Sequence, residues 1–462
     1  MTKKFIISAL PFIFGLFLLL LSIQRLYSQS DGNATCQTQS LYQQLKNLSS
    51  DQLLFGHQNS TFEGIGWEDK SGLKDRSDCL EAVGDFPAIH GFDFIRGFFF
   101  KQHVIRAYER GGIITFSDHM DNFWNGRDSW NTQGNTVKEI LKENSATQKR
   151  FINHLTKVAN FFKSLKDENG ALIPVIYRPF HENSGDWFWW SQPYCTAEEF
   201  VELWRFTVDY LRNQREVHNL LYAYSPSDPA FSGGYEAHYP GNQYVDIVGF
   251  DSYATIAYEM FLVANARLVV SFAEAHDKVA ALTEFGVNGG IQFANNADWF
   301  TQTFLKAIQE DSIARKLAYA HTWRNDRINH HWVPLPDDAT HADFVAFYED
   351  DFTLFERDLP DMYDCNLVTT ATEYEEYIAN KMELKMMPNP ASDYLFIKST
   401  KVNPENTFRL SIYNSIGQLI VKDDNFIVNN QILVGHLHQG LYFVHLLDQK
   451  EKKQTILPFF KN

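Results

Sequence analysis

Eight short apolar runs, each followed by a polar loop and then by a segment of helix length, constrain the fold of this chain more than any other feature. The runs are Leu53–His57, Pro87–Phe94, Gly112–His119, Ile173–Glu182, Leu220–Ser225, Val245–Tyr253, Val279–Phe285 and Leu317–Trp323. Between them lie segments such as Ala146–Lys166 and Thr196–Arg212, in which apolar residues recur at intervals of three and four. This alternation predicts an α/β fold with parallel strands and helical crossovers, and eight strands predict a closed (β/α)₈ TIM barrel.

A change of composition after Asp364 indicates a second domain. An acidic, threonine-rich stretch, TTATEYEEYIANKMEL, leads into short runs that alternate between apolar and polar residues. Such runs are typical of strands in a small β-sandwich. We therefore expect a barrel domain at residues 36–365, a linker at 366–383 and an all-β sandwich domain at 384–462.

Residues 1–28 are typical of an export signal. Two lysines precede an apolar run from Phe5 to Leu21, and the small residue Ser28 lies at a position suited to cleavage. An uncleaved membrane anchor is the alternative, because a run of about 17 residues is near the shortest that spans a bilayer. A proline and a glycine interrupt the run, however, and no second apolar segment of that length follows. We expect a secreted or cell-surface-attached monomer whose mature form does not span the membrane.

The net charge of −16 limits the partners of the chain. A strongly negative protein repels polyanions, so nucleic acid is not an expected partner and acidic polysaccharides are disfavoured. Neutral sugars are unaffected by this charge.

Four cysteines, Cys36, Cys79, Cys195 and Cys365, meet an oxidising compartment after export. They allow up to two disulfides with three connectivities, and their spacing does not resemble a zinc site. Cys36 and Cys365 bracket the predicted barrel, so a bond that ties its two ends is one of these possibilities.

Reactive side chains stand at the ends of the predicted strands, where barrel enzymes assemble their sites. These residues are His57, His119, Arg178, His181, Glu182, Asp251, Tyr253, Glu284 and Trp323. A lone glutamate at a strand end is commonly a helix cap or an ion-pair partner. Glu182 and Glu284, however, end the fourth and seventh runs and can face each other across a cleft. Hydrolysis of a glycosidic bond requires such a pair, one carboxyl protonated and the other ionised.

An aromatic run directly follows Glu182. Flat indole faces suit the apolar faces of pyranose rings. Trp187 is closest in sequence to the predicted acid, so it and Trp323 are candidates for the cleft. Trp189 and Trp190 are expected in the core.

Other hydrolytic chemistries have weaker support. No His-x-His pair lies near the end of a predicted barrel strand, so neither a metal nor another cofactor is expected. Ser225 lacks the Gly-x-Ser-x-Gly elbow, and Cys195 has no evident activating partner. No phosphate-binding glycine loop occurs.

The segment RPFHENSGDWFWW, which contains Glu182, resembles the acid/base motif of glycoside hydrolase family 26, a clan A family dominated by β-mannanases. GGIITFSDHMDN, GFDSY, TEFG and HTWRND resemble that family's third-, sixth-, seventh- and eighth-strand motifs, in the family's order. The resemblance spans roughly residues 50–330. It implies a secreted retaining endo-β-1,4-mannanase that hydrolyses internal bonds of a neutral β-mannan by double displacement, with no cofactor.

Residue by residue, the resemblance implies that Glu182 is the acid/base and Glu284 the nucleophile, with carboxyl groups about 5–5.5 Å apart. It implies that His181 positions the acid and that Tyr253 hydrogen-bonds the nucleophile. It also implies that His119, Trp187 and Trp323 line the subsite that holds the attacked sugar. Arg178 and Asp251 match motif positions and are expected to support the site.

Two departures from the family's pattern leave the preferred glycan open. Asn183-Ser184 stands where Met-Asn is usual, and Asp118 stands where an aromatic is common; both changes are expected beside the cleft. Mixed-linkage β-glucan and β-1,3-xylan are therefore alternative substrates. A non-catalytic surface protein that binds glycans is the alternative from another class.

The tail segments MPNPASDYLFI, LSIYNSIGQLI and LHQGLYFVHL resemble the C-terminal sorting domain of the type IX secretion system. This resemblance implies that secretion machinery is a partner and that the protein crosses an outer membrane, followed by release or surface attachment. A carbohydrate-binding β-sandwich is the alternative, although the tail contains no Trp for sugar stacking.

Overall fold

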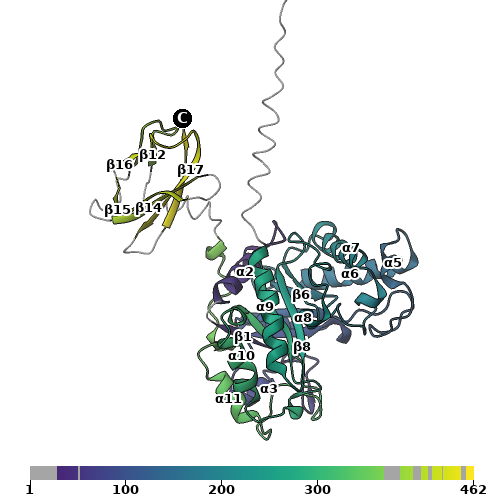
Figure 1. Cartoon of the computed structure of the whole chain (residues 1–462). Coiled ribbons are helices and arrows are strands. Elements are labelled where there is room, and N and C mark those ends of the chain that lie inside the picture. Colours follow the sequence, from purple (N-terminus) through teal and green to yellow (C-terminus); the bar gives the residue numbers. More distant parts are fainter. Residues whose placement is uncertain are drawn as a thin grey trace, which may run out of the picture. The chain divides into compact units, whose positions relative to one another are not determined.

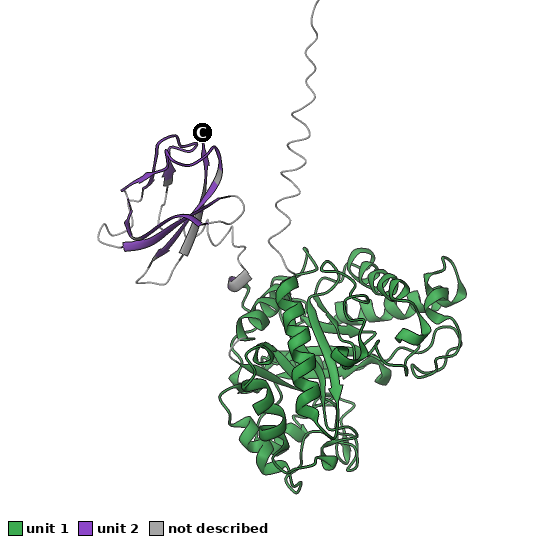
Figure 2. Cartoon of the chain, in the orientation of Figure 1, with its two compact units in different colours: residues 1–365 green, residues 366–462 purple. Residues whose placement is uncertain are grey.

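The computed structural model describes residues 29–49, 52–368, 385–398, 407–414, 419–428, 430–448 and 454–462 (Figure 1). The expected export signal at residues 1–28 and most of the expected linker at 366–383 lie outside the described residues. The chain divides into two compact units, one ending at Cys365 and the other beginning at Asn366 (Figure 2).

Eight parallel strands of the first unit close into a barrel, which confirms the predicted fold. They are β1 (Leu53–Gln58), β4 (Ile89–Asp93), β5 (Ile113–Asp118), β6 (Val175–Pro179), β7 (Leu220–Tyr224), β8 (Ile247–Tyr253), β9 (Val279–Gly286) and β10 (Tyr319–Thr322). The sheet is closed because β10 pairs back onto β1, with Leu54 opposite Tyr319. The two-residue strand β11 (Thr353–Leu354), which also pairs with β1, was not predicted.

Helices follow most of these strands and surround the barrel (Figure 1). Their bounds are α2 (Cys36–Leu48), α3 (Asp78–Val83), α4 (Lys101–Glu109), α5 (Thr136–Leu141), α6 (Ala146–Ser164), α7 (Ala197–Asp209), α8 (Pro229–Ser232), α9 (Tyr258–His276), α10 (Lys306–Gln309) and α11 (His341–Tyr348). A short hairpin, β2 (Glu63–Gly64) and β3 (Trp67–Glu68), lies between β1 and α3.

Helices α6 and α7 illustrate why these segments are helical. Ser145 caps α6 by accepting from the Gln148 N–H, and Thr196 and Glu199 form a reciprocal capping box at the start of α7. Each helix then buries one apolar stripe against the strands, such as Phe151 and Leu155 of α6.

The barrel interior is closed at the N-terminal ends of its strands by α2. Leu41 and Leu45 of this helix pack with inward-facing strand residues such as Ile89 and Ile176 in one buried cluster. A second and larger cluster fills the space between the outer faces of the strands and the surrounding helices. At the opposite end of the barrel, where the strands have their C-terminal ends, polar side chains such as His119 and Glu182 line a cleft.

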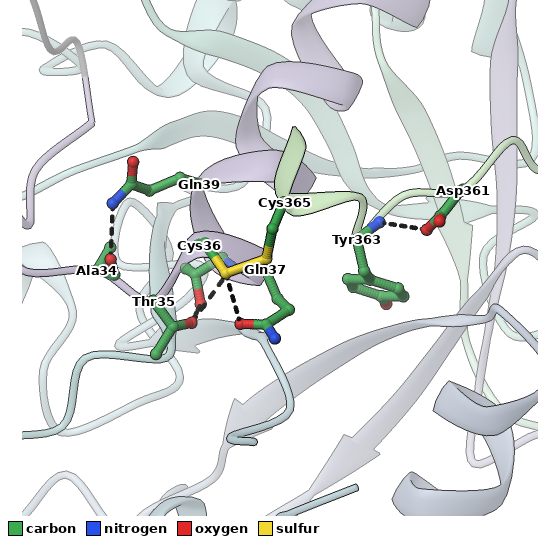
Figure 3. Close-up of a disulfide and its surroundings, with 9 residues drawn as sticks. Ala34, Thr35, Cys36, Gln37, Gln39, Asp361, Tyr363 and Cys365 are labelled. Carbon is green, nitrogen blue, oxygen red and sulfur yellow. Dashed lines mark hydrogen bonds between the residues drawn. A yellow bond between two sulfur atoms is a disulfide. The ribbon is translucent and has the colours of Figure 1, made fainter. Parts of the chain in front are cut away.

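A disulfide joins Cys36, the first residue of α2, to Cys365 (Figure 3). The two Cα atoms lie 5.2 Å apart, although the residues are 329 positions apart in the sequence. Cys79 and Cys195 are buried free thiols. Of the connectivities that the sequence allowed, the structure therefore contains the bond that ties the two ends of the barrel.

Replacing Cys36 and Cys365 together by Ser is expected to lower the free energy of unfolding by about 4–5 kcal/mol, because the bond restricts a very long loop in the unfolded chain. The melting temperature should fall by roughly 5–10 °C. Hydrolytic activity at 25 °C should be unchanged, because the bond lies at the end of the barrel away from the polar strand ends. Differential scanning calorimetry of both proteins, with reduced wild type as the control, measures the effect; equal melting temperatures would count against it.

The second unit is all-β, as predicted. Its strands are β12 (Lys385–Met387), β13 (Tyr394–Lys398), β14 (Thr407–Asn414), β15 (Leu419–Ile427), β16 (Gln431–Leu433), β17 (Gly440–Asp448) and β18 (Gln454–Lys461). They form a three-stranded antiparallel sheet, β12-β13-β16, and a four-stranded one, β15-β14-β17-β18. Leu395 and Ile432 of the first sheet share a core with Phe408 and Val444 of the second. In neither unit does any described helix combine the length and the apolar character needed to cross a membrane.

Candidate active site

Glu182 reaches the C-terminal end of the barrel through a turn with unusual backbone angles. Strand β6 ends at Pro179, after which Phe180 and Glu182 adopt positive φ values of 52° and 53°. Such angles cost a non-glycine residue roughly 1–3 kcal/mol each. The surroundings stabilise the turn, because Phe180 packs against Trp189 and Trp190, and the Glu182 N–H donates to the Ser225 carbonyl at 2.8 Å.

Glu284 faces the barrel interior because of an irregularity in β9. Phe250 pairs with Leu282 but the next residue of β8, Asp251, pairs with Glu284, so Thr283 is an inserted residue. Leu282 packs outside the barrel, and strict alternation would place Glu284 outside as well. The insertion reverses the alternation, as bulges beside active sites commonly do.

The two glutamates share a cleft of about 600 Å³ at the C-terminal ends of the strands. Seven of the nine predicted site residues line it: His119, His181, Glu182, Trp187, Tyr253, Glu284 and Trp323. Arg178 and Asp251, the other two, are buried behind Glu284. The structure therefore brings these nine residues together. His57, which also stands at a predicted strand end, is buried and does not line the cleft.

The two carboxyl groups have different hydrogen-bond partners. Glu284 accepts from the Tyr253 hydroxyl at 2.9 Å and from the Arg178 guanidinium, which also donates to Asp251 at 2.8 Å. These two donors hold the side chain of Glu284 in place. Glu182, which lines the cleft, accepts a hydrogen bond at its Oε2 from the Trp187 indole, at 2.8 Å.

The ionisation of the groups follows from these surroundings. Desolvation in the cleft raises the pKa of Glu182 to about 7, and the negative charge of Glu284 contributes to the increase. Burial raises the pKa of Tyr253 well above its usual value, and the charge of Glu284 does so too, so the hydroxyl remains a donor. Burial acts to lower the pKa of Arg178, but Asp251 and Glu284 raise it overall. The site thus holds a carboxyl that is protonated near neutral pH beside a carboxylate that accepts two donors.

One carboxylate oxygen from each of Glu182, Asp251 and Glu284 lies within 4.8 Å of the other two. Three such groups are the kind of set that holds a cation. Here, however, the Arg178 guanidinium is paired with both Asp251 and Glu284, so a positive charge already lies among them. The arrangement fits acid–base and nucleophilic chemistry better than metal coordination.

Two histidines lie beside the glutamates. Nδ1 of His119, which follows β5, lies 2.6 Å from the Asp93 carboxylate, and its Nε2 lies 3.3 Å from Nε2 of His181. Burial acts to lower the pKa of His119, but the charge of Asp93 raises it overall. Burial and the charge of Arg178 lower the pKa of His181 well below its usual value, so His181 is neutral.

Eight further residues line the cleft that sequence reasoning did not assign to it. They are Trp130, Phe188, Ser227, Asp228, Asn288, Gly289, His330 and Trp332. Trp130 stacks on His119 with ring centroids 5.2 Å apart, and it comes from the loop between β5 and α5. Trp332 contacts Tyr253 and comes from the loop after β10. Tryptophans in long polar loops were the available signal, but nothing in the sequence indicates toward which side such a loop folds.

The expectation that Asp118 lies beside the cleft is wrong. Its carboxylate accepts from Tyr177 at 2.9 Å and pairs with His154 of α6 at 2.8 Å, because the last residue of β5 points toward the surrounding helices.

Asn183, the second residue that departs from the family's pattern, is buried. Ser184, the third residue that departs from the family's pattern, lies beside the cleft. Its hydroxyl donates at 2.6 Å to the carbonyl of Ser227, which lines the cleft. Trp189 and Trp190 are buried, which confirms their expected place in the core.

A second cavity of about 390 Å³ adjoins the first and shares His119, Trp130, Trp323 and His330 with it. Arg96 and Arg324 also line this cavity, and both donate to Glu63. The four shared residues place this second cavity next to the catalytic centre.

Comparison with known proteins agrees with this geometry. The sequence profile of glycosyl hydrolase family 26 matches residues 30–327, and the profile of the secretion system C-terminal sorting domain matches residues 385–457. A mannan endo-1,4-β-mannosidase of Bifidobacterium adolescentis is 34% identical over 326 residues, which are 64% of this chain and 32% of that protein. One from Caldalkalibacillus mannanilyticus is 26% identical over 306 residues, 60% of this chain and 56% of that protein. This chain therefore spans about a third and just over half of the lengths of these relatives.

Solved structures give the same assignment. The structure of a family 26 β-mannanase from Bacteroides ovatus superposes with a TM-score of 0.65 at 34% identity and covers 71% of this chain and 98% of its own. The family profile covers more than half of this chain, and the carboxyl pair lies in the cleft at the ends of β6 and β9. By sequence, fold and site, the chain belongs to glycosyl hydrolase family 26 and carries a C-terminal secretion sorting domain.

Proposed function

We propose that the protein is a retaining endo-β-1,4-mannanase in which Glu182 is the acid/base and Glu284 the nucleophile. The observation that carries the proposal is that carboxylate oxygens of these residues lie within 4.8 Å of each other in one cleft. Retaining enzymes hold their carboxyl groups about 5–5.5 Å apart, whereas inverting enzymes separate them by about 6.5–9.5 Å to admit a water.

In the first step a carboxylate oxygen of Glu284 attacks the anomeric carbon and forms a glycosyl ester. The bond from that carbon to the leaving oxygen breaks, and Oε1 of Glu182 delivers its proton to the leaving oxygen. Arg178 and Tyr253 hold the attacking carboxylate in place through their hydrogen bonds. Trp187 fixes the acid by donating to its other oxygen, Oε2.

In the second step Glu182, now ionised, removes a proton from water as the water attacks the same carbon. The ester bond to Glu284 breaks, and the sugar leaves with the configuration that it had in the polymer. Loss of the negative charge on Glu284 in the ester intermediate lowers the pKa of Glu182, since that charge contributes to the increase in the resting enzyme. This change suits the switch from acid to base.

Mannan is the proposed substrate because the two relatives described above bear the name mannan endo-1,4-β-mannosidase. The aromatic lining of the cleft, with Trp130, Trp187, Trp323 and Trp332, suits a neutral pyranose chain. The second cavity adjoins the cleft and offers room for further sugar units, which favours cleavage within a polymer over release of single end units.

The test is a time course of products from linear mannan, galactomannan, mixed-linkage β-glucan and β-1,3-xylan. We expect rapid appearance of oligosaccharides of mixed length from the mannans and little reducing sugar from the other two polymers. Faster release from the β-glucan or the xylan would contradict the substrate, and binding to mannan without any release would favour the non-catalytic alternative.

The pH dependence tests the role of Glu182 separately. Because protonated Glu182 is required for the first step, kcat/KM is expected to fall about tenfold per pH unit above about pH 7. The residual activity of Glu182→Ala on a mannoside with a nitrophenol leaving group should lack this decrease. Persistence of the decrease in that variant would assign it to another group.

We also propose that the protein acts outside the cell. A sorting domain of this kind implies secretion or surface attachment. The barrel disulfide suits an oxidising compartment. Detection of activity in the medium or on intact cells, and its loss when residues 385–462 are deleted, tests this location.

A further inference from the structure

His119 and His181 face each other across the floor of the cleft, with Nε2 atoms 3.3 Å apart. Both rings are buried, and both line the cleft. A hydrogen bond between two imidazole nitrogens requires a proton on one and a lone pair on the other. Which ring donates therefore depends on a contact elsewhere in the pair.

Asp93, the last residue of β4, makes that contact. Its Oδ1 accepts from the backbone N–H groups of Ile95, at 2.8 Å, and of His119, at 3.3 Å. Its Oδ2 accepts from the Ser117 hydroxyl, at 2.5 Å, and lies 2.6 Å from Nδ1 of His119. Four donors around a buried carboxylate fit the anion. Burial acts to raise the pKa of Asp93, but the charge of His119 and these hydrogen bonds hold it at about 2. Because a carboxylate only accepts, Nδ1 of His119 carries a proton.

We propose that Asp93 is a positioning residue that fixes the tautomer of His119 and thereby the direction of the hydrogen bond between the two histidines. Above the pKa of His119, which the charge of Asp93 raises, the ring is neutral and carries its proton on Nδ1. Its Nε2 then presents a lone pair, so His181 donates from its own Nε2. Nδ1 of His181 is then bare. That atom is buried and has no hydrogen-bond partner among the described residues, a situation that an acceptor tolerates better than an N–H does.

The opposite tautomer of His119 would reverse the direction of the hydrogen bond between the two histidines. His119 would donate from Nε2, His181 would accept there, and His181 would bury an N–H at Nδ1 with no acceptor. The cost of that unpaired donor favours the direction that Asp93 imposes.

The consequence for catalysis rests on the proposed function. A sugar hydroxyl both donates and accepts. A hydroxyl that replaces the direct contact between the two Nε2 atoms would accept from His181 and donate to His119, so it is recognised in a single orientation. Such contacts act mainly in the transition state, where the sugar at the cleavage point is distorted. Loss of the correct tautomer should therefore lower kcat more than it raises KM.

Asp93→Asn tests the proposal. The two backbone N–H groups at Oδ1 require the amide oxygen there, so the amide NH₂ takes the place of Oδ2 and donates to Nδ1 of His119. The proton of the ring then moves to Nε2. An equivalent Asp→Asn change behind the base of a serine protease costs about 10⁴-fold in kcat. Here His119 is not the base, so we expect a loss of roughly 10²-fold, mostly in kcat.

Ser117→Ala is the matched control, because it removes another donor from the same Oδ2 but leaves the carboxylate facing His119. We expect it to keep kcat within about threefold of wild type. Protein labelled with ¹⁵N-histidine, with His119 assigned by the loss of its signals in His119→Gln, reports the tautomer directly. In spectra recorded above the pKa of His119, where the ring is neutral, wild type and Ser117→Ala should carry the proton on Nδ1, and Asp93→Asn should carry it on Nε2.

Three outcomes would overturn the proposal: a proton on Nε2 of His119 in wild type, an unchanged tautomer in Asp93→Asn, or equal losses of kcat in the two variants. The first needs no variant, so it stands even where Asp93→Asn does not fold. Wild type with the expected tautomer but without activity on any glycan would instead contradict only the proposed function.

Discussion

Glu284→Ala is expected to lower kcat on mannan by roughly 10⁴- to 10⁶-fold, the range that follows removal of a covalent nucleophile. The barrel should remain folded, because Ala removes one carboxylate from the buried group and leaves Arg178 paired with Asp251 at 2.8 Å. The expected loss is therefore one of chemistry, with KM little changed. Steady-state kinetics on manno-oligosaccharides, together with circular dichroism of the purified variant, separates the two effects.

Azide should rescue this variant on an aryl β-mannoside with a good leaving group. The space left by the carboxylate admits a small anion, which attacks from the same side and gives an α-mannosyl azide. Asp228→Asn is the control, because Asp228 lines the same cleft but is bonded to Ser252 and Asn265. Azide should leave that variant unaffected. Undiminished hydrolysis by Glu284→Ala, or a β-mannosyl azide, would contradict the assignment.

Glu182→Ala should discriminate between substrates by their leaving groups. On mannan, where the leaving sugar oxygen needs a proton, we expect kcat/KM to fall about 10³-fold. On a dinitrophenyl mannoside, whose leaving group departs without a proton, the loss in kcat/KM should be less than about tenfold. The second step still lacks its base, so the glycosyl ester should accumulate and give a burst of dinitrophenol. Equal losses on the two substrates would exclude Glu182 as the acid.

The eight strands were predictable because each is buried on both faces and therefore reads as a short continuous apolar run. β11 was not predictable, since two residues carry no pattern. The second unit was predictable from the change of composition after Asp364 and from the alternating runs that follow it. The disulfide was one possibility among several, because cysteine positions alone do not determine which sulfurs meet.

The site was predictable where a side chain follows directly from a strand end, as for His119 and Tyr253. It was not predictable where orientation depends on backbone irregularity. The insertion at Thr283 alone turns Glu284 inward, and two positive φ values aim Glu182. Asp118 shows the reverse error: it adjoins His119 in sequence, but consecutive strand residues point to opposite sides.

The central claim is that this carboxyl pair hydrolyses a β-mannosidic bond by two displacements. Proton NMR of manno-oligosaccharide hydrolysis, recorded before mutarotation, tests it most directly, since the anomeric signals of the first product report the configuration. A β-anomer that appears first and then equilibrates to α is the predicted result. An α-anomer as the first product would contradict the account, because it requires a single displacement by water.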